Sequence, residues 1–194
     1  MKLFNQLKNI VLGSYEMMHL KKDWCGYIGN SLSTFLWAFL LNLVSIPVLV
    51  YLVPNSNDPA QTLPPEQHIM LMLIMMVVVL AVVFLLSLAH RRHKKFALIY
   101  AGITYATFIV STAIFGAEAI MNMYEKSLYA LDAPLLARGL LMLAAIWMVV
   151  VISFVFKSAL EIRAAISLLM ASVMIFIIIA GQLLLQMTLF PPQV

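Results

Sequence analysis

Long apolar runs alternate with short polar segments along most of the chain. Five of these runs come close to the roughly 20 residues that an α-helix needs to cross the hydrocarbon core of a bilayer. They cover residues of about 35–53, 69–88, 96–120, 135–156 and 164–190. The second run is the clearest, because residues 69–86 are apolar without interruption. The pattern predicts an all-α, polytopic integral membrane protein, with five transmembrane helices in residues 31–194.

The segment before these runs, residues 1–30, has a different pattern. Several of its side chains recur at steps of three and four residues, which places them on one face of a helix. They are Leu3, Leu7, Ile10, Val11, Ser14, Met17 and Met18. Lys8, Lys21 and Lys22 add attraction to anionic lipid headgroups of about 1 kcal/mol each near the surface. We predict an amphipathic interfacial helix that either anchors the first crossing or serves as a docking surface for lipid or a partner protein.

The composition agrees with a membrane protein. Apolar residues make up 64% of the 194 positions and charged residues 10%, whereas a soluble domain has about 45–50% and about 25%. The mean hydropathy is +1.02. Five spans leave no room for a soluble catalytic domain within these residues. The single cysteine, Cys25, excludes an internal disulfide and a thiolate metal cluster.

The distribution of Lys and Arg predicts the orientation, because cytoplasmic connections carry more of these residues. With the N-terminus inside, only Lys126 and Arg138 lie outside. The cytoplasmic set is Lys2, Lys8, Lys21, Lys22, Arg91, Arg92, Lys94, Lys95, Lys157 and Arg163. We therefore predict a cytoplasmic N-terminus and an external C-terminus, in a bacterial inner membrane or alternatively a secretory-pathway membrane. The concentration of Lys and Arg in the cytoplasmic segments accounts for the net charge of +4, so no nucleic-acid partner is expected.

The third run carries two stripes of different character. The first stripe consists of small residues, along which another backbone can approach closely: Gly102, Ala106, Ala113 and Ala117. The second stripe lies roughly opposite and is polar: Tyr100, Thr104, Thr107, Ser111 and Glu118. A helix with both stripes should not face lipid, so we predict it in the centre of the bundle. Its hydroxyls either bond within the bundle or line a polar pathway.

A few further polar residues lie inside or next to the runs. Glu118 and Arg138 are near the same end of the third and fourth runs, and an isolated charge at membrane depth is costly. We interpret them as an ion pair between two helices; the alternatives are two snorkelling charges, or a proton or substrate site. We predict that the remaining polar residues form hydrogen bonds between helices, and the alternative is a role in transport. They are Asn42, Ser45, Gln182 and Gln186. Pro47 is expected to kink its helix and to free a carbonyl, which coordinates an ion in the transport alternative.

Enzyme signatures are missing from the sequence. It contains no HExxH, no GxSxG and no Gly-rich phosphate loop. His90 and His93 are spaced like metal ligands, but the arginines between them would repel a cation, so they indicate a solvated basic cluster. The methionines at positions 70, 72, 75 and 76 indicate lipid-facing packing, because no Cys or His accompanies them. We expect no catalytic residue, no metal and no cofactor.

A cytoplasmic N-terminal segment, five close-set spans, short links and a very short C-terminal tail resemble the Yip family of Ypt/Rab-interacting membrane proteins. The stretch Lys94–Gly102 is similar to the basic link and small-residue third span of the bacterial members. The resemblance implies a non-enzymatic membrane protein that organises or assists other membrane components as an adaptor or accessory subunit. Its partners would be membrane lipids, another membrane protein or a second copy. The alternative is a small transporter or channel component with a polar pathway along the third span.

Overall fold

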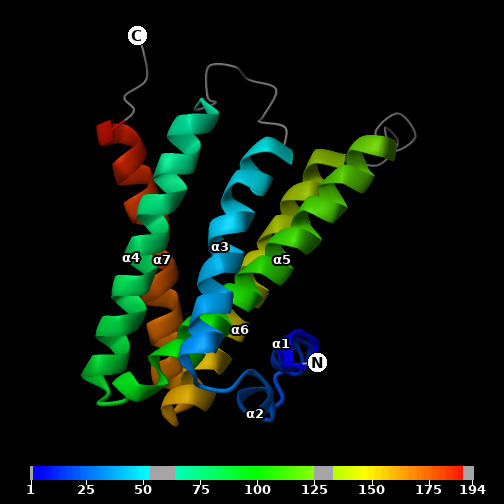
Figure 1. The fold of residues 1–194 in the computed structure, drawn as a ribbon. Coiled ribbons are helices and arrows are strands. Elements are labelled where there is room, and N and C mark those ends of the chain that lie inside the picture. The colour runs from blue at the N-terminus through cyan, green and yellow to red at the C-terminus, as the bar shows by residue number, and fades with distance from the viewer. Residues whose placement is uncertain (1, 53–63, 125–132, 190–194) are drawn as a thin grey trace.

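The computed structural model describes residues 2–52, 64–124 and 133–189, without the side chains of some helix-end residues. The elements are α1 (Lys2–Met18), α2 (Trp24–Ile28), α3 (Leu32–Leu52), α4 (Pro65–Ala89), η1 (His93–Lys95), α5 (Phe96–Tyr124), α6 (Ala133–Leu160) and α7 (Ala164–Leu189). All of them are helical, which confirms the predicted all-α class for the described residues. Figure 1 shows α3 to α7 running lengthwise through the bundle, whereas α1 is seen nearly end-on beside one end of it.

Among the described residues, four helices are long and apolar enough to cross a membrane. The qualifying segments are Pro65–Ala89, His93–Ile114, Met142–Leu160 and Ala164–Leu189. They correspond to the second to fifth predicted runs. The first run forms α3, which has 21 residues, and its apolar part within the fully described residues is Leu32–Val48. These helices are consistent with an integral membrane protein.

Several predicted boundaries differ from the observed ones, and two of these differences bear on the links between helices. α4 begins at Pro65, earlier than predicted, because proline suits the first turn of a helix, where its missing N–H has no intrahelical partner anyway. α6 continues past Lys157 to Leu160, so the predicted charged link shortens to residues 161–163. Its turn uses Glu161 in a left-handed conformation, with a φ of 59°.

The five long helices form a closed ring. α3 packs against α4, α4 against α7, α7 against α6, α6 against α5, and α5 against α3. α5 also contacts α1, α2 and α4. Of the four candidate spans it is the most enclosed, with 56% of its apolar window buried, compared with 17–33% for the others. This confirms the prediction that the third run lies centrally.

The N-terminal segment packs against one end of the ring. We call this end the basic end, because the α4–α5 and α6–α7 links there carry Arg91–Lys95 and Arg163. Trp24 of α2 is fully buried, and its indole N–H donates a hydrogen bond to Ser158 Oγ of α6 at 2.9 Å. Asn30 caps the start of α5, because it donates to the Lys94 carbonyl and accepts from the Leu98 N–H. These contacts join α2 to two helices of the ring.

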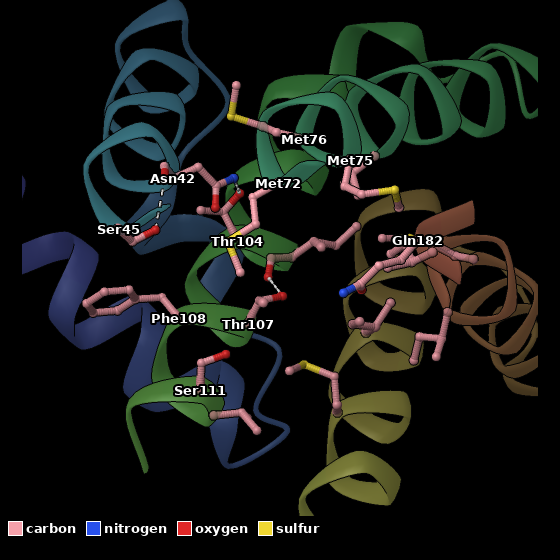
Figure 2. Close-up of a pocket in the computed structure, with 18 of the residues that line it drawn as sticks. Asn42, Ser45, Met72, Met75, Met76, Thr104, Thr107, Phe108, Ser111 and Gln182 are labelled. Atoms are coloured by element: carbon pink, nitrogen blue, oxygen red, sulfur yellow. Dashed lines mark hydrogen bonds between the residues drawn. The ribbon is translucent and has the colours of Figure 1, made fainter. Parts of the chain in front are cut away.

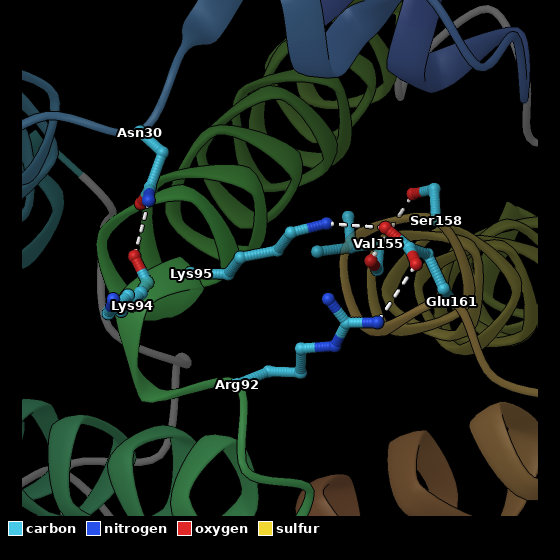
Figure 3. Close-up of polar contacts among 7 residues, drawn as sticks. All are labelled: Asn30, Arg92, Lys94, Lys95, Val155, Ser158 and Glu161. Atoms are coloured by element: carbon cyan, nitrogen blue, oxygen red, sulfur yellow. Dashed lines mark hydrogen bonds and ion pairs between the residues drawn. The ribbon is translucent and has the colours of Figure 1, made fainter.

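Glu161 connects the two links at the basic end. Its carboxylate lies 2.9 Å from Arg92 Nη2 and 2.8 Å from Lys95 Nζ (Figure 3). The hydrogen bond from Lys95 and the charges of Lys95 and Arg92 hold the pKa of Glu161 below its ordinary value of 4.5. Exposed ion pairs contribute little to stability, but this one joins the turn after α4 to the turn after α6.

Candidate functional site

A cavity of about 550 Å³ lies inside the ring, and all five long helices line it (Figure 2). This volume falls within the range of about 300–1,000 Å³ that is typical of small-molecule sites. Most of the lining is apolar, and none of the lining residues in the described part of the chain is charged. The polar lining residues are Asn42, Ser45, Thr104, Thr107, Ser111 and Gln182. An apolar cavity with a few polar groups is the usual form of a binding site.

Asn42 joins α3 to α5 at the edge of the cavity. Its side-chain N–H groups donate to Tyr100 Oη at 2.9 Å and to Thr104 Oγ1 at 3.1 Å. A buried amide needs such partners, because an unpaired polar group in apolar surroundings is costly. The prediction that Asn42 forms a hydrogen bond between helices is therefore confirmed.

Two lining hydroxyls are bonded within their own helices. Thr107 donates to the Ile103 carbonyl at 2.8 Å, and Ser45 donates to the Asn42 carbonyl at 2.9 Å. This arrangement uses the hydroxyl proton and leaves oxygen lone pairs for an incoming donor.

Two other polar side chains remain available to a guest molecule. Ser111 of α5 is half-buried and Gln182 of α7 is exposed, and neither side chain forms a hydrogen bond to another described residue. In Figure 2, Gln182 lies across the cavity from Asn42 and Thr104. The cavity therefore presents unused donors and acceptors on two of its sides.

Methionine side chains form much of the apolar wall. Those in the lining are Met72, Met75, Met76, Met148 and Met174. The sequence interpretation of the α4 methionines as lipid-facing is wrong for the first three of these, because α4 turns them into the ring. Met70 does fit that interpretation, since it is exposed. Flexible, polarisable methionines let a wall adapt to guests of different shape.

A packed layer separates the cavity from the basic end. The rings of Phe35 and Tyr100 lie 5.4 Å apart, and those of Phe35 and Phe96 lie 5.7 Å apart. Val155 and Phe156 of α6 are fully buried in the same core. Along α5 the cavity lining begins only seven residues after the helix starts, which corresponds to roughly 10 Å.

The two predicted stripes of α5 face different neighbours. Thr104, Thr107 and Ser111 of the polar stripe line the cavity. In the small stripe, Gly102 lies against Trp24 and Val155, and a Cβ atom at this position would come within 3.0 Å of both. The sequence predicted a neighbouring backbone here, but side chains occupy the space, because α2 inserts its indole ring. Ala106 is buried and Ala113 is exposed, so the close packing covers only the first half of the stripe.

Some predicted site residues lie outside the described part. The side chains of Leu3, Ala117, Glu118 and Arg138 belong to this group, so the predicted ion pair between α5 and α6 stays a prediction.

The rest of the predicted N-terminal docking residues are described. Leu7 and Val11 are exposed and Ile10 is half-buried. Lys8, Lys21 and Lys22 are exposed, and Lys21 pairs with Glu16 at 3.2 Å.

The sequence interpretation missed Trp24 and Glu161. Trp24 stands in a polar stretch without periodicity, and its partner Ser158 is 134 residues away. A lone large aromatic residue between two helices was the available signal. Burial near Trp24 also raises the pKa of the Cys25 thiol above its ordinary value of 9.0. Glu161 is a single acid in a short link opposite a basic link, which was a signal for an ion pair.

No protein-family model, curated protein or solved structure matches the chain. Within the described ranges, no group of three or more His, Cys, Asp or Glu side chains is arranged to hold a metal ion. The cavity geometry is therefore the basis for a functional proposal.

Proposed function

We propose that the protein is a non-enzymatic membrane protein that binds a lipid-like molecule in its cavity and so organises or assists other components of the membrane. One observation carries this proposal, namely the largely apolar cavity of about 550 Å³ that residues of five helices line. Its polar groups are hydroxyls and amides, which orient a guest. The resemblance to the Yip family, with an adaptor or accessory role, belongs to the same proposal.

The proposal includes a five-span topology with the N-terminus in the cytoplasm. α3 supports the fifth span, because its 21 residues lie between α4 and α5 in the ring. The basic residues Arg91–Lys95 support a cytoplasmic location of the basic end. A reporter fused after Val194 should be active only outside the cytoplasm. Activity only inside would contradict this topology.

We also propose that α1 lies in the cytoplasmic interface. Phe4, Leu7, Val11 and Tyr15 form an exposed apolar line at steps of three and four residues. α1 crosses the direction of the spans in Figure 1, as an interfacial helix does. This line is available to lipid or to a partner protein.

A small transporter or channel component is the second candidate function. The observation that favours it is the row of hydroxyls along α5, from Thr104 through Thr107 to Ser111, inside the cavity. The packed layer around Tyr100 and Phe35 argues for binding in the present conformation, because it interrupts a path to the basic end.

Native mass spectrometry of the full chain, extracted gently from its membrane, tests the binding function. Ala144→Phe fills the cavity from α6, whereas Ala81→Phe adds the same ring to an exposed position on α4 outside the lining. We expect the unmodified protein and Ala81→Phe to retain a bound small amphiphile, and Ala144→Phe to lose it. Equal retention by both variants would overturn the proposal. Stoichiometric protein companions in the same spectra would support the adaptor role.

A further inference from the structure

We infer that the guest of the cavity is an uncharged amphiphile, with one apolar chain or ring system and a small head that carries hydroxyl or carbonyl oxygens. The inference rests on the proposed function, because it names the class of molecule that the same cavity binds. Three observations carry it: the absence of charge in the described lining, the unused polar groups and the volume.

The first observation is that all described lining residues are uncharged. A phosphate or ammonium head inside the cavity would lose its hydration without gaining a counter-charge, which is costly in an apolar environment. The basic cluster Arg91–Lys95 lies at the basic end, beyond the packed layer that includes Phe96 and Tyr100. A charged headgroup therefore gains no counter-charge from the described lining of the cavity.

The second observation concerns the polar groups of the lining that are open to a guest. Asn42 is already bonded to Tyr100 and Thr104, whereas Ser111 and Gln182 have no partner among the described residues. A purely hydrocarbon guest would cover these two side chains without bonding them, at the cost of their hydration. A hydroxyl or carbonyl head pairs with the Gln182 amide and the Ser111 hydroxyl. The guest is thus polar at one point and apolar elsewhere.

The third observation is the size of the cavity. Its volume of about 550 Å³ lies in the middle of the range of about 300–1,000 Å³ that is typical of small-molecule sites. A single-chain amphiphile or a small ring system is a guest of this size class. The methionines of α4 let the wall follow a flexible chain.

A pair of probes with the same acyl chain separates head charge from chain burial. We would titrate the full chain in mild detergent with monooleoylglycerol or with oleoyl lysophosphatidylglycerol and count bound molecules by native mass spectrometry. The neutral probe should bind at least about 10-fold more tightly, and Ala144→Phe should abolish this binding while Ala81→Phe preserves it. Gln182→Leu should weaken the neutral probe by about 3- to 10-fold, as expected for one neutral hydrogen bond.

Each result decides one of the two proposals. If the lysophospholipid binds equally well and Ala144→Phe blocks it, the cavity binds lipid but the inference about the uncharged head is overturned. If Ala144→Phe changes the binding of neither probe, the proposed function itself fails. Ser111→Ala provides a second, milder variant should Gln182→Leu fold poorly, and unchanged binding of the neutral probe in a folded variant of either kind would contradict the predicted head contacts.

Discussion

The basic end of the bundle and the region around the cavity are built from the same five helices but differ in how fully their interior is occupied. At the basic end, Trp24, Tyr100 and Phe156 are fully buried, and interhelical hydrogen bonds and ion pairs link the elements. Farther along the ring, the helices enclose a cavity of about 550 Å³. We therefore expect the basic end to contribute more to the stability of the bundle than the region around the cavity. This second region can then receive a guest without unfolding of the bundle.

Dense packing and an open interior have opposite responses to substitution. In the packed region, side-chain removal creates a void and side-chain addition creates a clash. Around the cavity, added atoms enter space that is already present. Paired substitutions in the two regions therefore test the comparison directly.

Trp24→Ala should have the largest effect. It removes a fully buried ring and its hydrogen bond to Ser158, and losses of this kind cost about 3–5 kcal/mol. Trp147→Ala is the matched control, because Trp147 of α6 is 41% exposed and lies outside the buried core. Thermal or denaturant unfolding in detergent should show a large loss for the first variant and a much smaller loss for the second. Equal losses of stability in the two variants would contradict the expectation that the basic end is the more stable region.

Gly102→Ala should have an intermediate effect. Its new Cβ atom would lie 3.0 Å from the Trp24 ring and from Val155, and overpacking of this kind costs about 1–3 kcal/mol. Gly181→Ala is the matched change beside the cavity, where the nearest atom is 3.7 Å away on Met75. It should be neutral, or stabilising by up to about 1 kcal/mol, because alanine favours helix. Unfolding measurements that reverse this order would contradict the comparison.

Glu161→Gln should have the smallest effect, because its ion pairs are exposed. The pKa of Glu161 is lowered in the folded protein, so the stabilisation is present above the ordinary value of 4.5 and is lost as the pH falls through the lowered folded pKa. A small decrease in melting temperature is expected at pH 7. This decrease should disappear at strongly acidic pH and shrink in high salt. A difference between the two proteins that persists in acid would show that the carboxylate charge is not its cause.

Several features could be predicted because they depend on local pattern. The central position of the third run followed from its small and hydroxyl residues, and α5 is indeed the most enclosed candidate span. Asn42 was predicted to bond between helices, and it does. The start of α4 was misjudged, because the predicted run begins at residue 69, whereas the helix begins at Pro65, where proline fits a first helical turn.

The candidate site was predictable only in part. Thr104, Thr107 and Ser111 were recognised as one stripe, but a single helix does not reveal whether such a stripe meets a neighbour or a cavity. The methionines of α4 looked lipid-facing, because in a uniformly apolar helix the sequence does not distinguish the inner face from the outer face. Gly102 was linked to a neighbouring backbone, whereas its actual neighbour Trp24 comes from a segment far away in sequence.

The amino-acid sequence was enough to predict a set of apolar helices joined by short links. Helix formation in an apolar run depends on neighbouring residues and on the need to satisfy backbone hydrogen bonds. The sequence also determined which positions carry polar groups and on which side of each helix they lie. Three features became visible only in the folded structure: the ring of five helices, the burial of Trp24 at one end of the ring, and the position of the polar stripe of α5 beside a cavity. These features depend on contacts between residues distant in sequence, which no local pattern encodes.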